Sequence, residues 1–202
     1  ATNAQFLDED VIERIDVRFS DSLQETGWDI FTLDYQTTGP INTILNVTFM
    51  EHYSSLFKYL WRSKRVEYVL TFLKKKQMKN ALITNKFMAK IASVLHYSRN
   101  IVSEMIHFIK QMQYYIEFEV LESSWNELIR KIESASDIDQ LIEAQENFLS
   151  TVISRSMLDA ESQNLSEQLR AIYDIIIQFH SVEESLLNKV NEEIETRKAF
   201  DE

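Results

Sequence analysis

Histidines paired with carboxylates are the side chains of this chain with the clearest capacity for chemistry. Glu104 and His107 lie three residues apart, the spacing at which two helices of a bundle each offer a Glu-His pair to a di-iron centre. A second such pair is missing from the sequence, the four histidines are dispersed, and two glycines cannot build a phosphate-binding loop. We therefore expect exposed or hydrogen-bonded histidines, no metal, no cofactor and no enzyme activity.

A basic cluster stands out from a chain whose net charge is −11. Eight bases and a single acid occupy residues 58–79; the bases are Lys58, Arg62, Lys64, Arg65, Lys74, Lys75, Lys76 and Lys79. Two interpretations remain open: a solvated helix face with a flexible linker, or a docking patch for an acidic protein surface.

The composition excludes several classes of partner. The overall acidity argues against a general nucleic-acid binder, because neutralising phosphates needs a basic surface. No apolar run approaches the roughly 20 residues of a membrane span, so no membrane partner is expected. The chain contains no cysteine, which fits a reducing compartment. A soluble intracellular protein is the expectation.

The elements that would position these residues begin with a predicted β-hairpin. Apolar and polar residues alternate in IDVRF (15–19) and WDIFTLDY (28–35), which is typical of strands. Two strands alone are marginal in water, so Phe31, Leu33 and Tyr35 are expected to pin the hairpin to a larger body. QTTGP (36–40) reads as a turn in which Gly39 can take a positive φ and Pro40 fixes φ.

Helical periodicity dominates the rest of the chain and predicts a bundle. A capping box, Thr48 to Glu51, would start a helix that ends near Leu73. The other expected segments are a basic linker (74–80), a poorly defined helical segment (82–97), a long helix (98–134), a helix that begins after Ser136-Asp137, and a last helix (164–199) whose near-heptad stripe is interrupted at Glu183. The predicted fold class is mainly α, a helical bundle with a small N-terminal β-hairpin, in a single domain (1–45 hairpin and turn; 46–202 bundle).

Aromatic residues are abundant, and their helical spacing assigns most of them to the core. Trp61, Phe108, Met112 and Trp125 are expected there. Tyr59 and Tyr114 fall off the apolar faces, and an off-face tyrosine beside charged residues is a candidate interface anchor.

Four ordered motifs carry a family resemblance: DIFTLDYQTTGPI (29–41), YSSLFKYLWRSKRVEYVL (53–70), EMIHFIKQMQYYIEFEVLESSW (104–125) and FLSTVISRSMLD (148–159). Together they make the chain resemble the C-terminal half of a gamma-tubulin complex protein. The long central motif looks most like component 3, the fungal spindle pole body form included.

That resemblance implies a non-catalytic helical adaptor that binds gamma-tubulin and, with other complex components, templates microtubule nucleation at a cytoplasmic microtubule-organising centre or spindle pole body. It also implies a fragment that lacks the final helices of the family. Physical reasoning, not the resemblance, nominates the partner-binding residues. They are Asp34, Tyr35 and Pro40 near the turn, Lys58, Arg62 and Arg65 on a basic arc, and His107, Lys110 and Tyr114 on an off-core strip.

Two other function classes remain open on the sequence. The near-heptad last helix would suit a coiled-coil-like tether or scaffold that self-associates through residues 164–198. An enzyme would need a metal or cofactor that the residues do not indicate. The alternative for the motif residues is that they mainly specify the fold.

Overall fold

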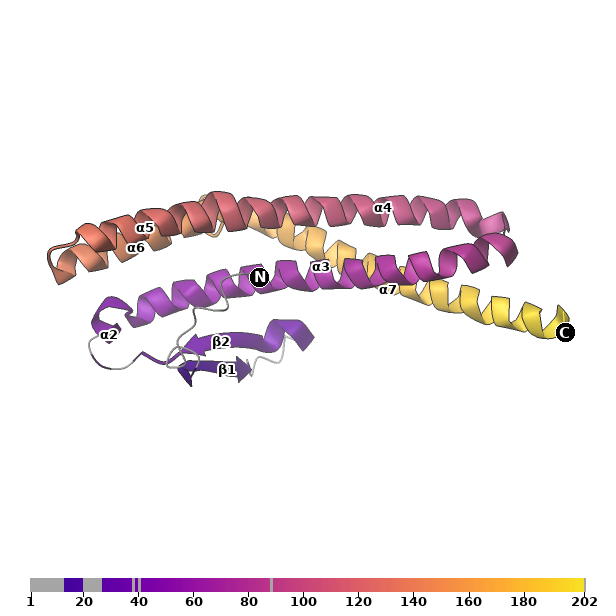
Figure 1. Cartoon of the computed structure of the whole chain (residues 1–202), viewed down its shortest axis with the longest axis horizontal. Helices are drawn as coiled ribbons and strands as arrows, with labels where there is room; N and C mark the ends of the chain where they lie inside the picture. The colour runs from indigo at the N-terminus through magenta and orange to yellow at the C-terminus, as the bar shows by residue number, and fades with distance from the viewer. Residues whose placement is uncertain (1–12, 20–26, 38, 40, 88, 202) are drawn as a thin grey trace. The chain divides into compact units, whose positions relative to one another are not determined.

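The computed structural model describes residues 13–19, 27–37, 39, 41–87 and 89–201. It confirms a mainly helical fold with an N-terminal two-stranded antiparallel hairpin (Figure 1). In chain order the elements are β1 (Ile15–Phe19), 3-10 helix η2 (Gly27–Ile30), β2 (Phe31–Tyr35), α2 (Ile41–Ile44), α3 (Val47–Phe87), α4 (Ala89–Tyr114), π-helix η3 (Tyr115–Glu122), α5 (Ser123–Ser134), α6 (Ile138–Arg155) and α7 (Gln163–Asp201).

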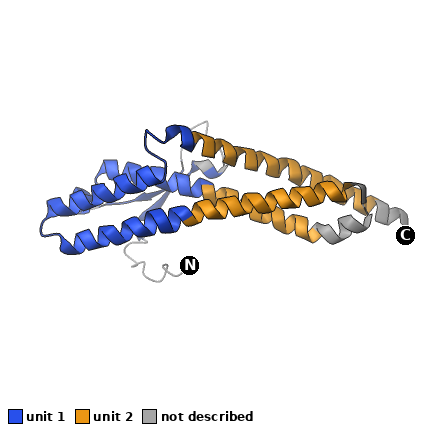
Figure 2. Ribbon diagram, turned by 90° about the horizontal axis from the view of Figure 1, so that it is seen from above, with its two compact units in different colours: residues 1–62, 115–166 blue, residues 63–114, 167–202 orange. Residues whose placement is uncertain are grey.

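The chain forms two compact units, each made of two separate stretches. Unit 1 comprises residues 1–62 and 115–166, and unit 2 comprises residues 63–114 and 167–202 (Figure 2). The first boundary between the units, after residue 62, lies inside α3. The second, after residue 114, lies where α4 ends and η3 begins.

The hairpin in unit 1 forms as predicted, but its second strand is shorter. In its register Ile15 lies opposite Tyr35 and Phe19 opposite Phe31. The expected strand over residues 28–35 is therefore wrong at its start, where residues 27–30 form η2. The 3-10 turn directs the Trp28 carbonyl to the Trp61 indole, whose Nε1 donates to it at 3.0 Å.

The prediction for the turn after the hairpin is confirmed, and the prediction for the start of α3 is not. Gly39 adopts a φ of +70° as predicted, a conformation that glycine takes without steric cost. The predicted cap at Thr48 is wrong, because α3 already begins at Val47 and the Asn46 Oδ1 accepts from the Phe49 amide at 3.0 Å. Asparagine is among the best helix N-caps, so Asn46 ends the turn and starts the helix.

The basic linker predicted at residues 74–80 is also wrong, since α3 runs through it to Phe87. Two of its side chains, Lys76 and Gln77, contact other helices of unit 2. Lys76 Nζ lies 3.1 Å from Glu184 Oε1 and donates to Asn188 Oδ1 at 2.9 Å, both on α7. These contacts with another helix stabilise the helical conformation of the segment, which the local sequence alone does not indicate. The segment over 82–97 likewise resolves into the end of α3 and the beginning of α4, nine residues before the predicted start at Ser98.

The core of unit 1 joins the first part of α3 to η3, α5 and α6. Its buried members are Phe49, Leu56, Ile116, Val120, Leu128, Ala144, Phe148, Leu149 and Val152. Asp137 caps α6 as predicted, its Oδ1 accepting from the Gln140 amide at 2.8 Å. Tyr59 packs against this core, so its assignment as an off-core anchor is wrong. Trp125 was expected in the core but is 52% exposed, and its ring makes an edge-on contact with Phe148.

Unit 2 is built from the rest of α3, α4 and α7. Its buried apolar residues are Val66, Leu70, Leu73, Leu95, Val102, Ile109, Leu169, Tyr173, Ile176, Leu187, Val190 and Ile194. A polar layer lies among them: Gln77 Nε2 donates to Ser98 Oγ at 3.0 Å and to Glu183 Oε1 at 2.8 Å. Glu183, which interrupts the predicted stripe of α7, is thus a buried hydrogen-bond partner of α3.

Two local irregularities belong to unit 1. The helix predicted over residues 98–134 contains the π-helix η3, whose buried residues are Ile116 and Val120. At the end of α6, Met157 takes a φ of 61°, and the Leu158 amide donates to the Ile153 carbonyl at 2.9 Å. This pairing of a left-handed residue with a six-residue hydrogen bond is a Schellman-type helix end, here without glycine.

Candidate functional site

An aromatic cluster fastens the hairpin of unit 1 to α3. The Trp61 ring lies 5.1 Å from that of Trp28 and 4.8 Å from that of Phe31, and Phe31 lies 5.8 Å from Phe57. Aromatic pairs at such distances contribute roughly 0.5–1.5 kcal/mol each beyond their burial. Of the three residues predicted to pin the hairpin, Phe31 has this role.

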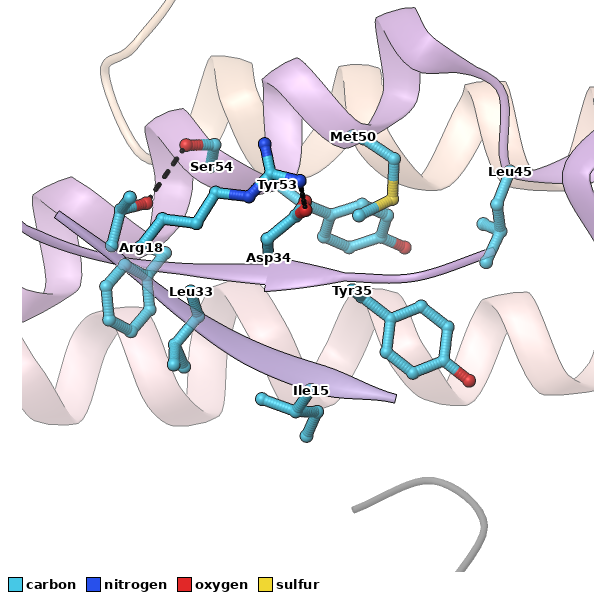
Figure 3. Close-up of a pocket in the computed structure, with 11 residues that line it drawn as sticks. Ile15, Arg18, Leu33, Asp34, Tyr35, Leu45, Met50, Tyr53 and Ser54 are labelled. Carbon is cyan, nitrogen blue, oxygen red and sulfur yellow. Dashed lines mark hydrogen bonds and ion pairs between the residues drawn. The ribbon is translucent and has the colours of Figure 1, made fainter. Parts of the chain in front are cut away.

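A cleft of about 510 Å³ lies between the hairpin and the first turns of α3 (Figure 3). Its apolar lining comes from Ile15, Leu33, Leu45, Met50 and Phe57. Its polar lining comes from Arg18, Thr32, Asp34, Tyr35, Tyr53 and Ser54. Figure 3 shows Arg18 and Asp34 on one side of β2, and Leu33, Tyr35 and Ile15 on the other. Leu33 is 37% exposed, so the prediction that it packs with Phe31 against the helices is wrong, whereas Tyr35 is half-buried at the cleft.

Asp34 is held by an ion pair across the hairpin. Arg18 Nη2 lies 2.5 Å from Asp34 Oδ2. The register places Asp16 directly opposite Asp34, and like charges opposite one another destabilise a sheet. Arg18, two residues further on, supplies the compensating charge. With 65% of the Arg18 side chain and 28% of the Asp34 side chain exposed, the pair contributes about 0–1 kcal/mol.

Tyr53 links the cleft to α6. Gln145 Nε2 donates to the Tyr53 hydroxyl oxygen at 2.5 Å. Burial raises the pKa of the Tyr53 phenol above its ordinary value near 10, and the hydrogen bond from Gln145 opposes that rise. The group is therefore an uncharged phenol at neutral pH, available to the cleft as a polar but neutral wall.

The predicted basic arc is divided between the units. Lys58, in unit 1, is exposed, and Arg62, at the end of that stretch, is half-buried. Arg65 is half-buried and belongs to unit 2. The half-burial of both arginines shows that the arc is not a uniformly solvated face.

The predicted off-core strip lies on α4 in unit 2. His107, Lys110 and Tyr114 are all exposed, and their spacing of three and four residues places them on one helix face. Phe108, expected in the core, is 37% exposed beside them. Asp34 and Tyr35 line the cleft in unit 1, and Pro40 lies outside the described residues.

Arg18, Leu45, Met50 and Tyr53 belong to the cleft but were not predicted from the sequence. The signal for Arg18 was available: it occupies a polar position of an alternating strand, two residues from an aspartate that faces a second aspartate across the hairpin. Leu45 and Met50 had no such signal, because apolar residues beside a helix start are ordinary core candidates.

Among the described residues, no cluster of three or more His, Cys, Asp or Glu side chains could hold a metal ion. Within that same part of the chain, no helix is long and apolar enough to cross a membrane.

Comparison with known proteins places the chain in a family. The family model described as "Gamma tubulin complex component C-terminal" matches residues 1–202. The gamma-tubulin complex component 3 homolog of Xenopus laevis is 48% identical over 203 residues, covering 100% of this chain and 22% of the relative. The human gamma-tubulin complex component 3 is 46% identical with the same coverage.

A fungal relative extends this group. The spindle pole body component alp6 of Schizosaccharomyces pombe is 36% identical over 200 residues, covering 93% of this chain and 23% of the relative. The chain thus spans less than a quarter of the length of these curated relatives. A match along its whole length confirms the resemblance drawn from the four motifs: the chain belongs to the gamma-tubulin complex component C-terminal family.

Proposed function

We propose that this chain binds gamma-tubulin and positions it within a gamma-tubulin complex for microtubule nucleation. The observation that carries the proposal is the family match over residues 1–202 together with 48% identity to a gamma-tubulin complex component 3 homolog. The mechanism is geometric: packed helices hold a partner at a fixed spacing and orientation, and no bond is made or broken.

The same relatives support the proposed setting. One is named as a spindle pole body component and others as gamma-tubulin complex components. We propose that the chain acts at a cytoplasmic microtubule-organising centre, beside other components of the complex. The single domain, with its hairpin and turn over residues 1–45 and its bundle over 46–202, remains part of this proposal.

The proposed contact residues fall into two groups. Unit 1 offers Asp34, Tyr35, Lys58 and Arg62, and unit 2 offers Arg65 and the exposed strip His107, Lys110 and Tyr114. Pro40 stays a prediction from the sequence. Tyrosine and arginine side chains are enriched among residues that anchor protein interfaces, which supports Tyr114 and the two arginines.

A charge-reversal experiment tests the basic arc. The affinity of purified gamma-tubulin for the chain is measured at two salt concentrations for Arg62→Glu/Arg65→Glu and for a matched control, Lys74→Glu/Lys75→Glu. Both variants change the net charge by the same amount, and Lys74 and Lys75 are exposed on the same helix. We expect at least tenfold weaker, salt-sensitive binding for the first variant alone, with circular dichroism unchanged. Equal affinities for the two variants would show that the arginines have no specific part in binding gamma-tubulin, and no binding by the folded, unaltered chain would overturn the proposal.

Self-association is a second candidate function, favoured by an exposed stripe on α7. Ile172, Ile175, Val182 and Leu186 are 36–69% exposed and recur at near-heptad spacing. The buried stripe of the same helix runs through Leu169, Tyr173, Ile176, Glu183, Leu187, Val190 and Ile194, so the near-heptad pattern of the sequence combines two faces.

A sedimentation experiment tests this alternative. A tether acting through α7 predicts concentration-dependent dimers that Ile175→Lys/Val182→Lys abolishes, because charges on a coiled-coil seam oppose pairing. A monomer at every concentration would exclude it.

A further inference from the structure

The cleft of unit 1 has the character of a binding site rather than of a packing defect. Its volume of about 510 Å³ lies within the roughly 300–1,000 Å³ of typical ligand pockets, which are apolar with a few placed polar groups. The hairpin is fastened to α3 by the ring contacts of Trp28 and Phe31 with Trp61 and by a 3.5 Å hydrogen bond between the Thr32 and Ser54 hydroxyls. Another molecule can enter the cleft while these contacts hold the hairpin.

The polar groups of the cleft present a donor and an acceptor side by side. A guanidinium has five N–H donors and a carboxylate about four lone-pair sites, so the Arg18–Asp34 contact leaves capacity on both partners. Together the two side chains carry no net charge. One residue of an extended chain matches this arrangement, since its own N–H and C=O point to the same side: the carbonyl accepts from Arg18 while the N–H donates to Asp34.

A charged ligand fits the same groups less well. An isolated carboxylate would meet Asp34, and an isolated ammonium would meet Arg18, so each would compete with the existing ion pair. The remaining polar lining, which includes the uncharged Tyr53 phenol and the Thr32 and Ser54 hydroxyls, is neutral. The complement of this cleft is therefore an apolar side chain next to a neutral amide.

We propose that the cleft receives an apolar side chain of gamma-tubulin, with the backbone C=O and N–H of one neighbouring extended residue bound by Arg18 and Asp34. This inference rests on the proposed function and assigns its central contact to unit 1. A large apolar side chain that enters a pocket on its partner is the usual form of an interface hot spot. Asp34 is then a recognition residue, and Leu45 and Met50 are walls of its pocket.

Filling the cleft tests the inference. Leu45→Trp places a larger ring in the cleft, and Val47→Trp places the same ring on an exposed position two residues away. We expect the first variant to weaken gamma-tubulin binding by about 30-fold, the scale of one hot spot, and the second to stay within about twofold. Asp34→Leu, which removes the acceptor, is expected to weaken binding by about tenfold, comparable with one lost charged hydrogen bond.

A fluorescent probe distinguishes the possible failures. The uncharged dye Nile red fluoresces on accessible apolar surface and carries no charge that would compete with the Arg18–Asp34 pair. It is expected to bind the cleft of the unaltered chain and of the Val47→Trp variant, and to lose that signal in Leu45→Trp and when gamma-tubulin is added. Full gamma-tubulin affinity in a folded, dye-negative Leu45→Trp chain would overturn the cleft inference and leave the proposed function standing. Absence of gamma-tubulin binding by the unaltered chain would overturn both. If Leu45→Trp does not fold, Ser54→Leu fills the same cleft and is judged by the same two outcomes.

Discussion

The two units of this chain reach a defined structure by different means. In unit 1 the hairpin is located mainly by tilted ring contacts of Trp28 and Phe31 with Trp61, beside one hydrogen bond from the Trp61 indole to the Trp28 carbonyl. In unit 2 three helices share a buried polar layer, in which Gln77 of α3 donates to Ser98 of α4 and to Glu183 of α7. Ring packing tolerates small displacements, whereas a buried hydrogen bond does not, because a misaligned helix leaves a polar group without a partner. The first unit is thus specified mainly by shape and the second also by register.

The largest expected effect comes from removing the aromatic anchor of unit 1. Trp61→Ala deletes the ring that both Trp28 and Phe31 contact, and large aromatic deletions cost about 3–5 kcal/mol. Hydrogen exchange should show lost protection of β1 and β2 while the amides of unit 2 keep theirs. Trp125→Ala, a deletion of the same ring at a 52% exposed site, is the matched control and should cost far less. Equal losses would mean that the anchor is not specific.

The polar layer of unit 2 gives the second largest effect. Glu183→Leu leaves the buried Gln77 amide without its α7 acceptor, which should lower the free energy of unfolding by about 1–3 kcal/mol. Adding Gln77→Leu replaces both partners and should recover most of that loss in a denaturant titration. Glu192→Leu, at an exposed position of the same helix, controls for the change of charge. If the double variant is no better than the single one, the layer does not set register through this bond.

Alkaline pH separates the units through their buried phenols. Burial raises the pKa of Tyr53 in unit 1 and of Tyr173 in unit 2 above the ordinary value near 10. A raised folded-state pKa means that the unfolded chain releases its proton first, so the stabilisation is complete below about pH 10 and is lost above it. Each Tyr→Phe variant should remove its own part of the alkaline loss and, at neutral pH, cost about 1 kcal/mol for the missing hydrogen bond. Tyr97→Phe, at an exposed site, should leave the pH profile unchanged.

The smallest expected loss of stability comes from variants at the observed and predicted starts of α3. Asn46→Ala removes the oxygen that accepts from the Phe49 amide and should lower stability by about 1 kcal/mol. Thr48→Ala should change it little, since the helix already includes Thr48. The two variants are compared by thermal unfolding, and the reverse ranking would restore the predicted capping box.

Local patterns predicted the elements whose determinants are local. The alternation in residues 15–19 found β1, Gly39 was placed in its left-handed conformation, and Asp137 was placed at the start of α6. The errors arose where distant residues decide the outcome. Residues 74–80 have the local sequence of a basic linker, but Lys76 forms hydrogen bonds with Glu184 and Asn188, which lie more than one hundred positions away. The predicted α7 stripe likewise mixed a buried and an exposed face of one helix, and Glu183, which interrupts that stripe in the sequence, is buried against Gln77 of α3.

The candidate site was predicted in part for the same reason. Asp34 and Tyr35 were chosen as residues near a turn, and they do line the cleft. The cleft is also lined by Leu45 and Met50, and nothing in the sequence distinguishes these two apolar residues from ordinary core residues. Only the folding of the hairpin onto α3 makes those residues part of a pocket. His107, Lys110 and Tyr114 were correctly predicted to be exposed, because a helix face can be read directly from spacing.

The π-helix η3 makes the chain tolerant of a change in length at one specific place. It starts at Tyr115, where the chain passes from unit 2 to unit 1. In an α-helix each added or deleted residue turns all later side chains by about 100°, which would bring the wrong faces of α5 to the core. A π-helix winds more loosely, and it commonly marks the point where one residue has been accommodated inside a helix. Deleting one residue between Tyr115 and Glu122 should therefore be absorbed as ordinary α-helix, with the phase of α4 and α5 adjusted there rather than propagated into either core.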